Sequence, residues 1–223
     1  MRILTKDGSF TLAHQVFEAS YHSTHGAYTE SKTVFIENGL EHILHAENQN
    51  LNILEIGFGT GLNFLLSLAH FQNHQGQITY HGIEKYPMSW DEVQQFEYLK
   101  LIEDLNSASH IYKTVIEEHG YSRLEENTNL IVELFESDFQ DHDYPSEFYD
   151  LIYYDAFGPG VQPELWSEEM AIKMGKTLKT GGVLVTYCVQ GQWRRHLVAA
   201  GFSCEKLPGP PGKREVLRAT KLT

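Results

Sequence analysis

The sequence predicts an α/β fold built on a mostly parallel sheet. From Leu51 onward, short apolar segments alternate with amphipathic ones, which is typical of parallel strands whose connecting helices cover both faces. The first apolar segment runs into a turn with three alternating glycines, and the last two flank a loop rich in proline and glycine. With 223 residues, 41% hydrophobic and 21% charged, the chain suits a single domain over 1–223.

Residues 1–50 precede the first sheet segment and form an N-terminal extension. The segment from Ile3 to Leu12 predicts a small hairpin, because its central Asp7-Gly8 pair readily adopts the backbone angles of a tight turn. The polar stretch from Tyr21 to Ser31, which contains Glu30, is a candidate lid over a ligand pocket. Apolar residues at helical spacing then predict a helix from Val34 to about His45.

The core, residues 51–223, contains seven candidate strands. They are Asn52 to Ile56, Gln77 to Ile83, Asn129 to Glu136, Asp150 to Tyr154, Val183 to Cys188, Phe202 to Leu207 and Glu215 to Thr220. The loop 208–212 between the last two predicts an antiparallel pair at the edge of the sheet. Helices are expected at Leu65 to His74 and from Arg194 to Gly201, and a helical insertion at about 86–128 contains Trp90 to Leu105 and His110 to His119.

Several classes of protein are disfavoured by composition. No uncharged apolar run approaches the roughly 20 residues of a membrane helix, and the charged Lys6 and Asp7 do not fit a signal peptide, so we expect a cytoplasmic protein without a membrane partner. Two cysteines cannot form a disulfide framework or a four-thiolate zinc site. His70 and His74 lack an obvious third ligand, so no metal is predicted.

The net charge of −13 is unevenly distributed along the chain. Residues 176–223 carry nine basic and two acidic side chains, whereas the remainder carries eight basic and 28 acidic ones. Such asymmetry favours an anion-binding face on an acidic body, although scattered surface lysines produce the same count.

The strongest local motif runs from Ile53 to Asn63 and holds Gly57, Gly59 and Gly61 between a strand and a helix. Glycines at this place let a ligand approach the backbone closely at the carboxyl edge of the sheet. A dinucleotide site uses G-x-G-x-x-G spacing, but here the spacing is G-x-G-x-G. Glu55 stands just before the loop, where it would repel a pyrophosphate and suit a ligand with an ammonium group.

Two more carboxylates follow the next strands. Glu84 ends the second strand, where it can accept hydrogen bonds from both ribose hydroxyls, and Asp138 follows the third, where an adenine amino group can be bound. A single acidic residue is commonly a surface residue, but three at successive strand ends favour S-adenosylmethionine over NAD as cofactor.

A fourth strand delivers Asp155 to the same edge of the sheet. The loop after it contains Phe157, and Trp166 follows, so both rings are candidates for the wall of a pocket that takes a flat base. The alternative is that Asp155 caps a short turn and that the two aromatic residues belong to the core.

These residues resemble the class I methyltransferases and, more narrowly, the MnmD family, the methyltransferase half of the bifunctional tRNA-modifying protein MnmC. The resemblance covers most of the chain. It is carried by Tyr21-His22-Ser23, Gly26 to Ser31 and Val34-Phe35; by Leu54 to Asn63; by Tyr154 to Pro159 with Pro163 to Trp166; and by Arg194-Arg195, Ala200-Gly201-Phe202 and Gly212 to Glu215. The elements around Asp155 and Lys213 are its most specific part.

The resemblance implies a Rossmann-like, seven-stranded sheet and methylation of 5-aminomethyl-2-thiouridine at the tRNA wobble position. The flavin-dependent oxidase half of MnmC has no counterpart before Thr223, so only the methylation step is expected. We expect Asp155 to orient the substrate amine and accept its proton, and Arg194, Arg195, Lys213 and Arg214 to contact anticodon-stem phosphates. A spermidine-synthase-like aminopropyltransferase, a small-molecule methyltransferase and a non-catalytic nucleotide-binding module remain as alternatives.

Overall fold

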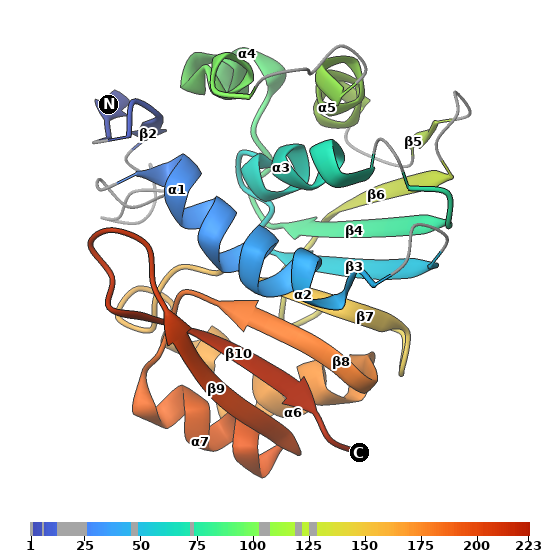
Figure 1. The fold of residues 1–223 in the computed structure, drawn as a ribbon, viewed down its shortest axis with the longest axis vertical. Coiled ribbons are helices and arrows are strands. Elements are labelled where there is room, and N and C mark those ends of the chain that lie inside the picture. The colour runs from blue at the N-terminus through green and yellow to red at the C-terminus, as the bar shows by residue number, and fades with distance from the viewer. Residues whose placement is uncertain are drawn as a thin grey trace.

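The structure, a computed structural model, contains an eight-stranded sheet with helices on both faces (Figure 1). It describes residues 2–5, 7–12, 26–45, 49–71, 74–102, 108–118, 122–124 and 129–223. The strands of the sheet are β3 (Leu51–Ile56), β4 (Ile78–Glu84), β5 (Ser122–Leu124), β6 (Leu130–Glu136), β7 (Tyr149–Tyr154), β8 (Leu178–Thr186), β9 (Phe202–Pro208) and β10 (Glu215–Lys221).

The strand order is β5-β6-β4-β3-β7-β8-β10-β9. Strands β6, β4, β3, β7 and β8 pair in parallel, so their carboxyl ends share one edge of the sheet. Strand β10 pairs antiparallel with both β8 and β9, which confirms the predicted antiparallel edge. The seven predicted strands are all present, and the short β5, antiparallel to β6, was not predicted.

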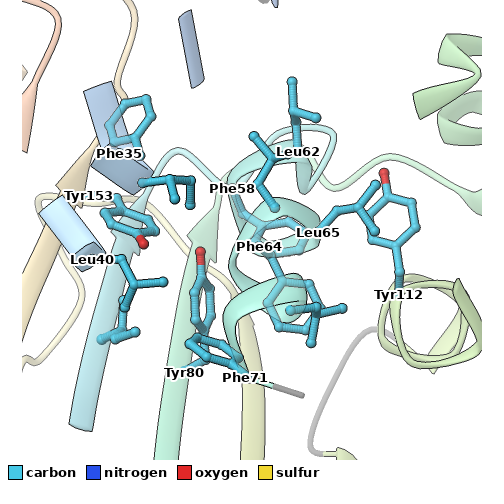
Figure 2. Close-up of a cluster of buried hydrophobic side chains, with 14 of the residues drawn as sticks. Phe35, Leu40, Phe58, Leu62, Phe64, Leu65, Phe71, Tyr80, Tyr112 and Tyr153 are labelled. Carbon is cyan, nitrogen blue, oxygen red and sulfur yellow. The ribbon is translucent and has the colours of Figure 1, made fainter. Parts of the chain in front are cut away.

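One face of the sheet is covered by the N-terminal helical segment and by α3 (Leu62–Phe71) and α5 (Ala108–Glu118) (Figure 1). The N-terminal segment runs through α1 (Ala27–Ser31), the wide π-helical η1 (Lys32–Leu40) and α2 (Glu41–Ile43). Figure 2 shows the side chains that this face buries, with Phe35 from the helix, Phe64 from α3 and Tyr80 and Tyr153 from the sheet. Gly39 allows the helix to lie close to the sheet, because a Cβ there would come within 2.9 Å of Val185.

The opposite face is covered by α6 (Glu168–Thr177) and α7 (Gly191–Ala199). Helix α6 begins at Ser167, whose hydroxyl accepts a hydrogen bond from the Met170 N–H, an ordinary N-terminal cap. Trp193 of α7 is fully buried and stacks on Tyr154 with a ring-centre distance of 5.1 Å. Because residues alternate between faces along a strand, Leu51 and Ile53 of β3 face the first set of helices, and Leu54 and Ile56 face this one.

Elements outside the sheet agree less closely with the predictions made from the sequence. The predicted hairpin is present as β1 (Arg2–Leu4) and β2 (Phe10–Leu12), and the N-terminal helix begins at Ala27, ahead of the predicted Val34. A single helix was predicted from Trp90 to Leu105, but its described part, residues 90–102, contains three short turns, α4 (Trp90–Val93), η2 (Gln94–Phe96) and η3 (Tyr98–Lys100). The interruption is at Glu97, whose φ of 57° cannot continue a right-handed helix.

Two further helix boundaries shift toward the N-terminus. Helix α3 starts directly after the glycine turn and ends at Phe71, so His74 lies beyond it and its Nε2 contacts the Gln49 carbonyl at 2.6 Å. Helix α7 starts at Gly191, which places Arg194 and Arg195 in its middle. Of the candidate lid, residues 21–25 fall outside the described residues, and Ala27 to Ser31 are helical.

Candidate active site

An open cavity lies at the carboxyl ends of β3, β4 and β7, and the empty space in it and at its mouth is about 560 Å³. Its walls come from the turn after β3, the end of β4, the segment after β6 and the loop after β7. The lining residues are Gly57, Phe58, Gly59, Thr60, Leu62, Asn63, Glu84, Lys85, Tyr86, Phe139, Asp155, Ala156, Phe157 and Gln162.

The glycine turn joins the strand ends tightly. Gly57 has a φ of 85°, and a Cβ at this position would come within 2.7 Å of the Asp155 carbonyl oxygen, so glycine is required here. The Gly57 N–H also donates to the Ile83 carbonyl at 3.0 Å, which ties the turn to β4. Gly59 lines the cavity, but Gly61 does not, because it packs against Phe58 and Tyr112. Gly61 therefore shapes the turn rather than contacting a ligand in the cavity.

Glu84 closes the turn from the neighbouring strand. Its carboxylate accepts the Gly59 N–H at 3.0 Å and the Tyr86 N–H at 2.9 Å. Burial raises the pKa of Glu84, and these backbone donors oppose the shift. Each carboxylate oxygen can accept a second hydrogen bond, so the group keeps acceptor capacity at the cavity wall. The predicted contact of Glu84 with hydroxyl groups of a ligand stays a prediction.

Asp138 stands beside the cavity rather than in its wall. Its Oδ2 forms an ion pair with Lys85 at 2.6 Å, and its Oδ1 accepts the Gln140 N–H at 3.0 Å. The hydrogen bond from Lys85 holds the pKa of Asp138 below its usual value. The adjacent Phe139 lines the cavity instead. The predicted contact between Asp138 and an adenine stays a prediction.

A buried chain of hydrogen bonds links the glycine turn to Asp155. Nδ2 of Asn63 donates to Glu55 at 2.8 Å and to Asp155 Oδ2 at 2.9 Å, while the Tyr80 hydroxyl donates to Glu55 at 2.6 Å. Glu55 is 0% exposed and lies outside the cavity wall, so it does not reach a ligand there as its sequence position suggested. Instead Glu55 fixes the amide of Asn63, which in turn orients Asp155.

Asp155 has an unusual electrostatic environment for an aspartate. Burial of the carboxyl raises the pKa of Asp155 to about 8, with Glu30 adding to the rise and the Asn63 amide and Lys213 opposing it. Its backbone N–H donates to the Ile56 carbonyl at 2.9 Å, which holds it against the end of β3. A carboxyl group with this pKa can both hold and release a proton near neutral pH.

The two candidate aromatic residues differ in position. Phe157 lines the cavity, and its predicted contact with a flat base stays a prediction. Trp166 is 3% exposed and belongs to the core beneath it, packing edge-on against Tyr154 and Trp193. Its ring N–H donates to the Phe157 carbonyl at 2.7 Å. Trp166 therefore positions the loop that carries Phe157 and does not form a wall of the cavity.

The predicted cationic surface is divided. Arg195 and Arg214 are exposed, and Arg194 is half-buried on α7. Lys213 lies in the loop between β9 and β10, and its ammonium forms an ion pair with Glu30 at 2.8 Å and lies 4.0 Å from the centre of the Tyr187 ring. The predicted phosphate contacts of all four residues stay predictions.

Two residues of the site region, Gln162 and Tyr187, were not predicted to act there, whereas Glu30 belongs to the stretch that was proposed as a lid. Gln162 lines the cavity, Tyr187 donates its hydroxyl to the Ala156 carbonyl at 2.7 Å, and Glu30 is 8% exposed at the start of the N-terminal helix. Tyr187 directly follows a strand that ends at the ligand edge, which is a signal that sequence reasoning can use. For Glu30 the signal was the polar stretch from Tyr21 to Ser31, but that signal did not identify Lys213 as its partner.

A family model described as S-adenosyl-L-methionine-dependent methyltransferase matches residues 103–222, more than half of the chain. The chain belongs to this family. Among the described residues, no group of three His, Cys, Asp or Glu side chains is placed to hold a metal ion. None of the described helices has the length and apolar character that crossing a membrane requires.

Curated relatives of this methyltransferase share a name, tRNA 5-methylaminomethyl-2-thiouridine biosynthesis bifunctional protein MnmC. The protein from Pseudoalteromonas translucida is 33% identical over 92% of this chain and 34% of its own length, and that from Campylobacter hominis is 29% identical over 93% and 31%. The chain thus spans about a third of the length of these relatives. A crystal structure of MNMC2 from Aquifex aeolicus has the same fold, with a TM-score of 0.72 and 22% identity over 98% of this chain and 69% of that one.

The cavity of this methyltransferase fits S-adenosylmethionine, the cofactor of its family. Within the described part of the chain, no hydrogen-bond partner reaches Oδ1 of Asn63 or Oε1 of Gln162, although both side chains are buried and line the cavity. Buried acceptors without partners are unfavourable, and the amino and hydroxyl groups of the cofactor are donors that can satisfy them. Glu84 and Gly59 line the same cavity, and the contact of Glu84 with the ribose stays a prediction.

Proposed function

We propose that this protein methylates the aminomethyl nitrogen of 5-aminomethyl-2-thiouridine at the wobble position of tRNA, giving 5-methylaminomethyl-2-thiouridine. The shared name of the relatives specifies the product, 5-methylaminomethyl-2-thiouridine, and the substrate is inferred as the same nucleoside before its amine is methylated. The reaction is supported by the hydrogen bond from Asn63 to Asp155, which holds a proton-accepting carboxyl group at the cofactor cavity. Since tRNA is the substrate, we infer that the protein acts in the cytoplasm.

The chemistry requires a neutral amine, because a protonated amine has no lone pair to attack a methyl group. When bound, S-adenosylmethionine supplies a methyl group activated by its positively charged sulfur. An ordinary aspartate with a pKa near 3.8 would be a poor acceptor for the proton of an alkylammonium, whose pKa is about 10. The raised pKa of Asp155, about 8, narrows this gap, so the proton can move to the carboxylate while the amine stays hydrogen-bonded and oriented.

The direct test is methyl transfer with purified protein. Labelled S-adenosylmethionine is incubated with tRNA from cells that lack this methylation, and the tRNA is digested to nucleosides. We expect the label in 5-methylaminomethyl-2-thiouridine. Label in another nucleoside, or in none, contradicts the proposal. Transfer to a free amine with equal efficiency supports a small-molecule methyltransferase, and use of decarboxylated S-adenosylmethionine with a polyamine supports an aminopropyltransferase.

Asp155→Asn tests the proton acceptor in the same assay. The amide keeps an oxygen that can accept the Asn63 hydrogen bond but cannot take a proton, so we expect turnover to fall by about 10²- to 10⁴-fold. Cofactor affinity should change less than about threefold, since no ionic contact to the cofactor is assigned to Asp155. Asp143→Asn removes a carboxylate from an exposed loop and is the matched control.

A further inference from the structure

Beside the cavity, three segments that are far apart in the sequence bring together Glu30, Tyr187 and Lys213. Glu30 comes from α1, Tyr187 follows β8, and Lys213 lies in the loop between β9 and β10, which reaches toward the start of α1 in Figure 1. The Lys213 ammonium is 2.8 Å from a Glu30 carboxylate oxygen and 4.0 Å from the centre of the Tyr187 ring.

This arrangement has the chemistry of a binding site for an alkylammonium ion. A carboxylate on one side and the face of an aromatic ring on another are the groups that proteins use to hold such a cation away from water. The Glu30 side chain is 10% exposed and that of Lys213 is 28% exposed, so the pair is shielded well beyond an ordinary surface ion pair. In this structure the ammonium group of Lys213 occupies the site.

The cluster is continuous with the reaction site. The Tyr187 hydroxyl donates to the carbonyl of Ala156, which lines the cavity directly after Asp155. Asp155 itself lines the cavity, and Glu30 and Lys213 lie close enough to Asp155 to change its pKa. Asp155 and Glu30 thus offer two carboxyl groups to one cation.

We propose that Glu30 and Tyr187 form, together with Asp155, the subsite for the protonated aminomethyl group of the substrate, and that the Lys213 ammonium occupies this subsite until the substrate displaces it. This inference rests on the proposed function. The loop of Lys213 is closed by its own backbone bonds, from the Gly209 N–H to the Arg214 carbonyl at 3.1 Å and from the Lys213 N–H to the Pro210 carbonyl at 2.9 Å. The side chain can therefore leave without opening the loop.

The test compares two tRNAs that differ only in the aminomethyl group of the wobble nucleoside. Dissociation constants of both tRNAs are measured for the wild type and for Glu30→Gln. S-adenosylhomocysteine, the demethylated form of the cofactor, is present in place of S-adenosylmethionine so that no methyl transfer occurs. The wild type should prefer the aminomethyl tRNA by about ten- to hundredfold, the range of one charged hydrogen bond. In Glu30→Gln most of this preference should disappear while affinity for the second tRNA stays unchanged.

Two controls separate the amine subsite from a structural role. Glu205→Gln removes an exposed carboxylate that also forms an ion pair with a basic residue near the C-terminus, because Glu205 lies 2.8 Å from Arg218. This variant should keep the preference for the aminomethyl tRNA. Thermal unfolding shows whether Glu30→Gln is folded. A Glu30→Gln protein that keeps the full preference overturns the inference, as does one that loses affinity for both tRNAs equally. A wild type with neither preference nor methyl transfer overturns the proposed function instead.

Lys213→Met gives an independent test, because it removes the internal cation and keeps the length of the side chain. We expect the affinity for the aminomethyl tRNA to rise several-fold, with little change for the other tRNA. If Lys213→Met weakens the binding of both tRNAs and reduces the salt dependence of that binding, Lys213 contacts phosphate, and its role as a displaced cation is refuted.

Discussion

The two halves of the site are built in different ways. The inner half consists of the glycine turn after β3, Asp155 after the adjacent parallel strand β7, and Asn63 of α3, whose amide donates hydrogen bonds to Glu55 of β3 and to Asp155. The outer half consists of Glu30, Tyr187 and Lys213, which come from the two ends of the chain and the end of β8, and are joined by an ion pair and a ring contact. The inner half is thus fixed by the sheet, whereas the outer half depends on how separate segments dock.

The largest effect is expected from changing the inner half at Gly57. Gly57→Ala places a methyl group 2.7 Å from the Asp155 carbonyl oxygen and forces alanine to a φ of 85°. Left-handed strain and overpacking together should lower the free energy of unfolding by about 2–5 kcal/mol. Because the turn also lines the cavity, calorimetry should show at least tenfold weaker binding of S-adenosylmethionine.

Two glycines supply matched controls for this change. At Gly181 the φ is 79°, but no atom lies within 4 Å of the place that an alanine methyl group would take, so Gly181→Ala isolates the left-handed strain. At Gly160 there is open space and no positive φ, so Gly160→Ala should be nearly neutral. If Gly57→Ala unfolds no more easily than Gly181→Ala, the close approach to Asp155 is not important for stability.

The pH dependence of stability tests the buried carboxyl of the inner half. The pKa of Asp155 is about 8 in the folded protein and 3.8 for an unperturbed aspartate, so the folded state holds the extra proton between these values. The stabilising effect of that proton is complete below pH 4 and is lost as the pH rises through 8. Asp155→Asn does not ionise, whereas the wild type loses about 4 kcal/mol of stability over this range, so the melting temperature of the variant relative to the wild type should increase by about 8–16 °C from pH 5 to pH 8.5. A constant difference across this range contradicts the raised pKa.

The sequence predicted the inner half well because strand, turn and next strand are local patterns. It misjudged Glu55 because proximity to a glycine turn does not specify the direction of a side chain. Residue alternation was available to correct this, since Glu55 has the same parity as Leu51 and Ile53 and so points under α3 with them. For Lys213 no such correction existed, because its partner Glu30 is brought to it only by docking of α1 against the loop between β9 and β10.

The N-terminal hairpin connects the outer half to the rest of the fold. The Asp7 carboxylate accepts hydrogen bonds from the N–H and the hydroxyl of Thr29, at 2.9 and 3.0 Å. Thr29 directly precedes Glu30 in the sequence. Burial opposes ionisation of Asp7, but hydrogen bonds from Ser9, Thr29 and Thr5 outweigh it and lower the pKa of Asp7 to about 2. The hairpin thus caps and positions the start of α1.

Asp7→Ala should therefore lower the free energy of unfolding by about 1–2 kcal/mol, the usual effect of losing a helix cap. It should also raise the KM for aminomethyl tRNA, because Glu30 loses its support, while affinity for S-adenosylmethionine is retained. Asp143→Ala removes the same charge from an exposed loop and should change neither quantity. An Asp7→Ala protein with a reduced cofactor affinity but an unchanged KM would show that the hairpin supports the inner half instead.

The smallest effect is expected at the exposed arginines, which lie outside both halves. Arg195 is on α7, which starts just after β8 at the ligand edge of the sheet, and Arg214 is exposed beside Lys213. If each contacts one tRNA phosphate, Arg195→Gln and Arg214→Gln should each reduce the slope of log Kd against log salt concentration by about 0.7–0.9. The loss should be the same for tRNAs with and without the aminomethyl group, because phosphate contacts do not sense the base. A preference that changes with either arginine would place that residue in the amine subsite, and an unchanged slope would remove it from the tRNA interface.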